Sequence, residues 1–162
     1  MGQDSITFTE LYRRYSADVH RFAYWLSGDP DEAKDIVSES FVRVWTSDAP
    51  IREGTVKAYL FTIARNLYLR RSVHTRRFTG ISEENAGSTQ RTERETEARS
   101  ELEQTLAAMQ SLSEIDRTVL TLRSFDELSY DEIAAVTGLT VAAIKVKVFR
   151  ARAALEAKRA QF

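Results

Sequence analysis

The sequence predicts an all-α protein made of two small helical domains joined by a flexible linker, the second containing a helix-turn-helix. Apolar residues recur every three or four positions through long windows, which only two prolines and six glycines interrupt. A polar stretch near the middle lacks the apolar side chains that a folded segment buries. Near the C-terminus, a short helical pattern, a glycine and a basic helical pattern follow one another, as in a helix-turn-helix.

The first domain is expected to cover residues 1–78 and to contain three helices. Apolar stripes at helical spacing place these helices at residues 9–27, at residues 29–45 and from residue 55 into an arginine-rich end. Asp29 and Pro30 have the residue types of a helix N-cap and first helical position, so they mark where the second helix begins.

Residues 79–95 form the predicted linker, with the sequence TGISEENAGSTQRTERE. Burial cannot offset the entropy of ordering such a polar segment. The second domain, residues 96–162, begins with one helix that reaches Leu112 and another that Ser113 can cap. Because helices this short need one another's apolar faces, we expect one compact four-helix domain.

The helix-turn-helix is expected from Ser129 to Arg159. Ser129 and Glu132 have the spacing of a capping box, Gly138 suits a turn that needs a positive φ, and Thr140 can cap the second helix. This second helix carries six lysines or arginines and one glutamate. A cationic second helix is typical of a major-groove reader. An ordinary antiparallel helix pair with a solvated basic face is compatible with the same pattern.

Charge is segregated along the chain, although the net charge is only −1. Residues 29–39 hold five acids and one lysine, residues 65–78 hold five arginines and no acid, and residues 83–103 hold seven acids and three arginines. The local field decides what a surface attracts. Two basic segments separated by an acidic one predict two nucleic-acid contacts. The arginine cluster could instead serve only to stabilise the C-terminal end of its helix.

Several classes of function are disfavoured. The chain has no cysteine, which excludes a disulfide framework and a thiolate zinc site. His20 and His74 lack a catalytic partner pattern, and we find no common hydrolase, metalloprotease or nucleotide-binding motif. We therefore expect no enzyme activity, catalytic residue, metal or cofactor. We also expect no signal peptide, and no apolar run approaches the ~20 residues that span a membrane.

Three segments in order resemble a bacterial RNA polymerase sigma factor of the extracytoplasmic-function (ECF) group. They are DPDEAKDIVSESFVRVW, KAYLFTIARNLYLRR and a helix-turn-helix ending in IKVKVFRARAAL. The resemblance covers residues 8–159. It implies a region 2-like domain at residues 1–78, an acidic linker at residues 79–95 and a region 4-like domain at residues 96–162. It further implies a cytoplasmic transcription initiation factor that directs core RNA polymerase to promoters and that an anti-sigma factor inhibits.

The resemblance also implies where partners bind. The helix at residues 29–45 is similar to the one that docks on the polymerase clamp, and its implied contacts are Asp35, Glu39, Phe41, Arg43 and Trp45. The loop at residues 47–55 and the helix at residues 57–71 are similar to the part that captures and melts the minus-ten element. The implied minus-ten contacts are Arg52, Lys57, Tyr59, Phe61, Arg65, Asn66, Arg70 and Arg71. The helix at residues 141–152 is similar to the reader of the minus-thirty-five duplex. Its implied contacts are Thr140, Ala142, Lys145, Lys147, Arg150 and Arg152.

These residue types suit those roles. Arginines hold phosphates, and aromatic rings stack on unpaired bases. An acidic helix complements a basic partner surface, and an acidic linker mimics nucleic acid inside a basic channel.

The chain departs from the group's usual pattern at three places. Ser113 stands where many members have proline, Tyr59 where many have tryptophan, and Ala142 and Ala143 where many have a Gly-Thr pair. Alanine contacts methyl groups but reads no hydrogen-bond donor. The base preference of the recognition helix therefore does not follow from the resemblance.

Two other functions remain open at this stage. A dimeric helix-turn-helix regulator that binds duplex DNA without polymerase would use the same second domain, although the first lacks the strand-helix alternation of a receiver domain. A pure interaction module, such as a polymerase-binding inhibitor, would not need two basic segments. The sigma factor interpretation is the one we carry forward.

Overall fold

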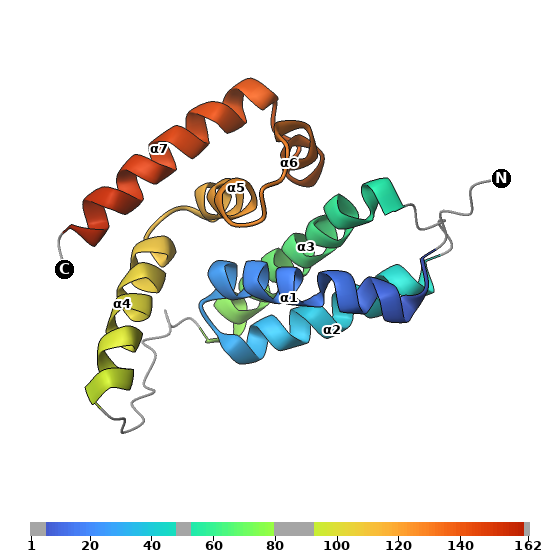
Figure 1. Ribbon diagram of the computed structural model, residues 1–162, viewed down its shortest axis with the longest axis horizontal. Helices are drawn as coiled ribbons and strands as arrows, with labels where there is room; N and C mark the ends of the chain where they lie inside the picture. Colours follow the sequence, from blue (N-terminus) through green and yellow to red (C-terminus); the bar gives the residue numbers. More distant parts are fainter. Residues whose placement is uncertain (1–5, 48–52, 80–92, 161–162) are drawn as a thin grey trace.

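The computed structural model describes residues 6–47, 53–79 and 93–160, and every regular element within these ranges is a helix. The helices are α1 (Phe8–Ser27), α2 (Pro30–Thr46), α3 (Glu53–Thr79), α4 (Glu93–Gln110), α5 (Glu114–Ser124), α6 (Tyr130–Thr137) and α7 (Val141–Arg159) (Figure 1). The predicted all-α class is confirmed.

Local sequence signals explain most helix boundaries. The Asp29 side chain accepts hydrogen bonds from the backbone of Asp31 and Glu32, and Pro30 opens α2 as predicted. Gly28 ends α1 with a φ of 72°. The backbone groups left unpaired at these helix ends therefore find partners close by in the sequence.

The same holds in the helix-turn-helix. Ser129 and Glu132 form the predicted capping box at the start of α6, and Gly138 ends that helix with a φ of 76°. The Thr140 side chain accepts a hydrogen bond from the Ala143 backbone at the start of α7. Both predicted caps and the predicted turn glycine are confirmed.

α3 begins at Glu53 and not at residue 55, and α4 ends at Gln110, two residues before the predicted Leu112. Two further differences lie beside the linker. α3 continues through Thr79, and α4 begins at Glu93, inside the segment predicted to be a linker. Glutamate and arginine are good helix formers, so a charged composition does not by itself end a helix. Residues 80–92 of the predicted linker lie outside the described residues.

The first three helices pack side by side around an aromatic and aliphatic core (Figure 1). Phe22 of α1 and Phe61 of α3 are fully buried, and their rings meet edge to face with centroids 5.0 Å apart. Ile36 and Phe41 bring α2 into the same core. This arrangement leaves one face of α2 and one of α3 for other contacts.

The two predicted domains share their core. α5 lies between α1 and α7, and it buries residues around most of its circumference, including Val119, Leu120 and Leu122. Val119 and Leu122 continue the core of the first domain, while Leu120 packs with Trp25 of α1 in a second cluster. The chain thus folds as two helical units pressed together, with α5 as the central element.

Among the described helices, none combines the length and apolar content that a membrane crossing requires. Within the same residues, no three histidine, aspartate or glutamate side chains gather in a way that could hold a metal ion.

Candidate nucleic-acid and protein interfaces

The outer side of α7 is the basic surface that the sequence predicted. Ile144, Val148 and Ala151 face inward and are buried. The remaining side carries exposed residues from the predicted minus-thirty-five set. These are Thr140, Ala142, Lys145, Arg150 and Arg152. A helix that buries one side in its own domain and exposes cations on the other can approach the phosphates of a DNA groove.

Contacts from α5 and α6 orient several of these cations. The Lys145 ammonium lies 5.2 Å from the centroid of the Tyr130 ring. Arg152 donates a hydrogen bond of 3.1 Å to the hydroxyl oxygen of Ser124. Lys147 is half-buried, and its ammonium lies 4.0 Å from a carboxylate oxygen of Asp116 on α5. Lys147 therefore leans toward the domain, while Lys145 and Arg152 remain on the open side.

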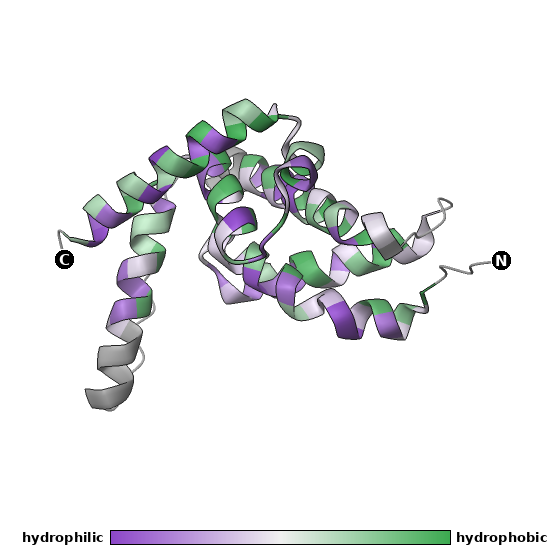
Figure 2. Ribbon diagram, turned by 45° about the horizontal axis from the view of Figure 1, so that its top comes forward, coloured by the Kyte–Doolittle hydropathy of each residue, from purple (hydrophilic) through white to green (hydrophobic). Residues whose placement is uncertain are grey.

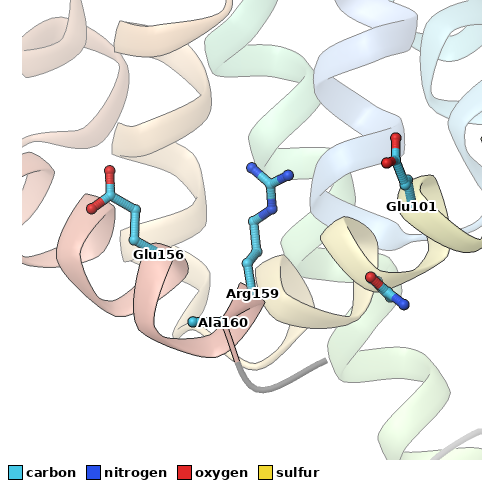
Figure 3. Close-up of a pocket in the computed structure, with 5 residues that line it drawn as sticks. Glu101, Glu156, Arg159 and Ala160 are labelled. Carbon is cyan, nitrogen blue, oxygen red and sulfur yellow. The ribbon is translucent and has the colours of Figure 1, made fainter.

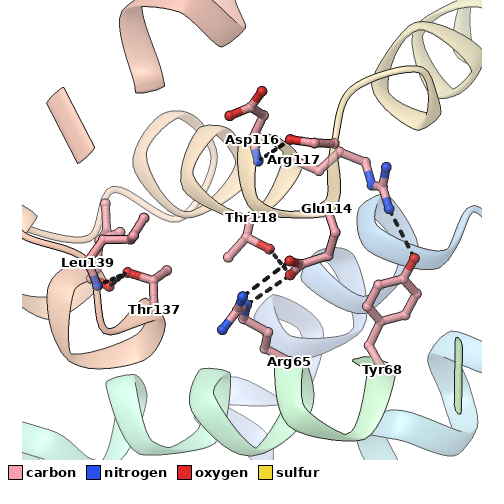
Figure 4. A network of polar contacts seen from close by, with 10 residues as sticks. Arg65, Tyr68, Glu114, Asp116, Arg117, Thr118, Thr137 and Leu139 are labelled. Atoms are coloured by element: carbon pink, nitrogen blue, oxygen red, sulfur yellow. Dashed lines mark hydrogen bonds and ion pairs between the residues drawn. The ribbon is translucent and has the colours of Figure 1, made fainter. Parts of the chain in front are cut away.

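The second domain engages the basic residues of α3. Arg65 donates to both carboxylate oxygens of Glu114 on α5, from Nε at 2.8 Å and from Nη2 at 3.2 Å (Figure 4). Thr118 donates a further hydrogen bond of 2.9 Å to Glu114. Lys57 donates to the backbone oxygen of Asp126 at 3.2 Å. Two predicted minus-ten residues are thus occupied by contacts within the chain.

The other predicted minus-ten residues separate into exposed and buried groups. Tyr59, Asn66 and Arg70 are exposed on α3. Phe61 is fully buried against Phe22, so it supports the helix from inside and cannot stack on a base while this core is intact. Arg52 lies outside the described residues.

The acidic side of α2 is tied to α3. Asp35 and Glu39 both lie on the surface, with side-chain exposures of 66% and 41%. The Arg71 guanidinium of α3 lies 3.7 Å from Asp35 and 3.8 Å from Glu39, and Arg43 lies 3.2 Å from Glu39. Arg71, predicted to contact DNA, therefore sits with the predicted polymerase contacts, and the acidic set is partly neutralised.

An aromatic group covers one end of α1 and α2. Phe41 is 2% exposed, so it packs inside and offers no direct contact to a partner, unlike the role that the resemblance implied. Its ring meets that of Tyr12 with centroids 5.1 Å apart. Trp45, which is 53% exposed, meets Phe8 at 5.2 Å. Trp45 remains a candidate contact, and Tyr12, at 47% exposed, joins it as a surface aromatic.

A buried aspartate joins the two domains. The Asp126 carboxylate is shielded from solvent and accepts a 2.7 Å hydrogen bond from Arg21 of α1. Burial raises the pKa of Asp126, although the Arg21 hydrogen bond and charge oppose this rise. The same hydrogen bond raises the pKa of Arg21.

Three further contacts cross between the domains. Arg117 is buried and donates to the Tyr68 hydroxyl at 3.0 Å (Figure 4). The Gln110 amide donates to backbone oxygens at the end of α1 at 3.1 Å. Trp25 and Phe125 stack with ring centroids 5.3 Å apart and an interplanar angle of 8°. Sequence reasoning missed all of these contacts, because the two partners of each lie far apart in the chain and no spacing signals them.

A small pocket lies between α4 and α7, lined by Glu101, Gln104, Glu156, Arg159 and Ala160 (Figure 3). Its lining is mostly charged, and carboxylates approach it from both helices. None of the predicted polymerase or DNA contacts lies in this pocket.

Two family models match the chain in order. Sigma-70 region 2 matches residues 11–78, which contain α2 and almost all of α1 and α3. Sigma-70 region 4 matches residues 102–155, which contain α5, α6 and most of α7. The intervening residues include the acidic segment.

Curated relatives cover most of the chain. The ECF sigma factor SigM of Bacillus subtilis is 30% identical to this chain, and the match spans 94% of this chain and 94% of SigM. EcfG of Rhodopseudomonas palustris is 34% identical and covers 86% of this chain and 77% of its own length. SigE of Mycolicibacterium smegmatis is 29% identical, and this chain matches 59% of its length.

Solved structures share the arrangement of both domains. The sigma factor RpoE of Bartonella quintana, crystallised with the anti-sigma factor NepR, has a TM-score of 0.78 at 25% identity and covers 93% of this chain and 95% of its own. CnrH, solved in complex with the cytosolic domain of CnrY, has a TM-score of 0.67 at 28% identity. The match covers 93% of this chain and 85% of the CnrH chain. With both regions matched in order and relatives of 30% identity or more along most of its length, this protein belongs to the ECF RNA polymerase sigma factors, which act in transcription initiation.

Proposed function

We propose that the two domains divide promoter recognition between them. Residues 1–78 bind core RNA polymerase and hold the opened minus-ten element, and residues 96–162 hold the minus-thirty-five element as duplex DNA. The acidic segment at residues 79–95 threads through the polymerase. The protein performs no chemistry itself and works in the cytoplasm, where bacterial RNA polymerase acts.

The single observation that best supports this division is the outer side of α7. Lys145, Arg150 and Arg152 are exposed on the second helix of a helix-turn-helix, and that helix is secured by a buried side formed by Ile144, Val148 and Ala151. This is the arrangement that places cations along the phosphates while the helix enters a major groove.

The exposed part of α2 supports the polymerase contact. Asp35, Glu39 and Trp45 all reach the surface, so an acidic and aromatic patch is available to a basic partner. Arg71 and Arg43 hold the acids in place, which lowers the entropy lost on binding.

The minus-ten function requires a change of arrangement. Arg65 and Lys57 contact Glu114 and Asp126 in the packed chain, so phosphates must displace these partners. We propose that polymerase binding separates the two domains and releases both side chains. Tyr59, Asn66 and Arg70 are already exposed and extend the same surface.

An anti-sigma factor is a proposed inhibitor. The chain matches the fold of RpoE, solved with NepR, over 93% of its length at a TM-score of 0.78, which spans both domains. CnrH was solved with a protein partner as well. An inhibitor that binds the packed arrangement better than the separated one would shift the population toward it.

Binding to bacterial core RNA polymerase, followed by fluorescence anisotropy of the labelled chain, tests the proposal. We expect saturable binding that weakens in the Asp35→Asn/Glu39→Gln variant and is retained in Asp131→Asn, a matched exposed acid on α6. A folded chain that shows no binding would remove the proposed role. Tight binding to duplex DNA without polymerase would then favour a dimeric helix-turn-helix regulator.

A further inference from the structure

α7 is apolar on two opposite sides. Ile144, Val148 and Ala151 are buried in the domain, as expected. On the outer side, Val146 is 47% exposed and Phe149 is 75% exposed. Figure 2 shows apolar and hydrophilic residues alternating along this helix. Two large apolar side chains exposed together on one side of a helix form a patch of the kind that marks an interaction site.

The outer apolar residues form one continuous line. Exposed alanines extend it in both directions at the spacings i, i+4, i+7 and i+11, which fall on one side of a helix. We name this line the apolar stripe of α7: Ala142, Val146, Phe149 and Ala153. The stripe starts in the first turn of the helix, where recognition helices contact base edges.

Cations border the apolar stripe on both sides. By helical geometry, Lys145 and Arg152 lie along one edge of the stripe and Arg150 along the other, and all three are exposed. The matching partner is therefore anionic along two rims and apolar between them. The major groove of duplex DNA has this pattern, because phosphates line its rims and thymine places a C5-methyl group on its floor.

We propose that α7 selects duplex DNA by contact with thymine C5-methyl groups, and that Val146 and Phe149 are its specificity-determining residues. The inference rests on the proposed minus-thirty-five function of α7 and names the base chemistry that this function reads. No side chain of the stripe can donate or accept a hydrogen bond, so the stripe cannot recognise the polar edges of guanine, cytosine or adenine.

The length of the stripe sets the size of the target. Phe149 lies seven positions after Ala142, which corresponds to a rise of roughly 10 Å along the helix axis. This is about three base-pair steps of duplex DNA. We therefore expect a short run of thymines, on one strand or divided between the two, rather than a single base.

The test separates the methyl group from every other property of the base. The full chain is assembled with bacterial core RNA polymerase, and bound sequences are selected from a random duplex library. Each thymine of an enriched duplex is then replaced singly by deoxyuridine, which pairs identically and lacks only the C5-methyl group. We expect a loss of affinity of about fourfold at each contacted thymine and none elsewhere.

Variants assign the loss to the apolar stripe. Phe149→Ala and Val146→Ala should bind thymine and deoxyuridine duplexes equally at the positions that each residue contacts. Leu102→Ala, which removes a 41% exposed apolar side chain from α4, serves as the matched control and should keep the full difference. Because Phe149 and Val146 project outward, their replacement should leave the circular dichroism spectrum and core polymerase binding unchanged.

The outcomes distinguish this inference from the proposed function. Equal affinity for thymine and deoxyuridine duplexes at every position, by a chain that still binds polymerase and duplex, overturns thymine reading and leaves the proposed function in place. The apolar stripe would then be assigned to a protein partner. Absence of polymerase binding overturns the proposed function itself, and absence of duplex binding by the assembled complex overturns both.

Discussion

α3 and α7 carry the two basic surfaces of the chain, and these surfaces differ in whether their cations are bound by other residues of the chain. On α3, Arg65 and Lys57 are bound to Glu114 and to the backbone of Asp126. On α7, Lys145 and Arg150 stay exposed, opposite the side that packs into the domain. One surface is engaged inside the packed chain, while the other is ready to meet duplex DNA.

This difference matches the chemistry of the two proposed targets. Duplex DNA exists before polymerase acts, so a surface for it can be exposed at all times. Opened DNA exists only after the strands separate, so a surface for it can remain occupied until polymerase is bound. Occupied cations also reduce non-specific attraction to nucleic acid in the unbound chain.

The largest expected effect comes from breaking the packing that holds α1 against the end of α5. Trp25 is 9% exposed and stacks on Phe125 in the cluster between the domains. Trp25→Ala should lower the free energy of unfolding by about 3–5 kcal/mol, measured by urea denaturation. Trp45→Ala, at 53% exposed, is the matched control and should cost less than about 1 kcal/mol. Equal losses of unfolding free energy in the two variants would show that the interdomain cluster stabilises the protein no more than an exposed aromatic contact does.

The next effect concerns the charges of α7. In the Lys145→Ala/Arg150→Ala variant, the slope of the logarithm of the duplex-binding constant against the logarithm of the salt concentration should become shallower by up to about two. Each lost phosphate contact removes about one released counterion. Lys57→Ala with Arg65→Gln on α3 should leave the slope of the unbound chain unchanged. The measurement is anisotropy titration of a labelled duplex at several salt concentrations. If both pairs change the slope alike, the two surfaces are equally accessible.

A smaller effect should follow from releasing Arg65. Glu114→Gln removes the charge from the Arg65 contact, whose side chains are 14% and 25% exposed. DNA must displace Glu114 from Arg65, so weaker packing between the domains should favour DNA binding. If the variant loses about 1 kcal/mol of this packing, a single-stranded oligonucleotide should bind roughly fivefold more tightly. Glu101→Gln, an exposed acid on α4, is the control. Unchanged binding in Glu114→Gln would mean that this ion pair does not limit access to α3.

The smallest effect is a pH dependence of stability from Asp126. Burial raises the pKa of Asp126, so the folded state holds this proton more tightly than the unfolded state. Between the two pKa values, the Asp126 contribution to the free energy of unfolding therefore falls as pH rises from about 4. The difference in unfolding free energy between wild type and Asp126→Asn, followed by urea denaturation across acidic pH, should show this slope. A difference that stays constant with pH would contradict it.

Local signals predicted most of the fold. Asp29 with Pro30, Ser129 with Glu132, and Gly138 each act through backbone groups within a few residues, so their effects are visible in the sequence. The same is true of the basic side of α7, because helical periodicity separates buried from exposed residues once the helix is located.

The site residues were harder to predict where apolar side chains were involved. The resemblance implied that Phe41 and Phe61 contact partners, yet both are buried in the first domain. Phe149 lies among lysines and arginines, and its 75% exposure depends on which side of α7 faces α5. Burial of an aromatic side chain is a property of three packed helices, so a single helical pattern does not determine it.

By itself, the sequence determined the helices, their caps, the segregation of charge and the resemblance to a two-domain sigma factor. Only the tertiary structure decided that the domains pack together, with Glu114 on Arg65, Asp126 on Arg21 and Arg117 on Tyr68. The physical reason is distance along the chain. Caps and helical periods are set by neighbours within one or two turns, whereas these contacts join residues about 50 to 100 positions apart, and three-dimensional packing selects them.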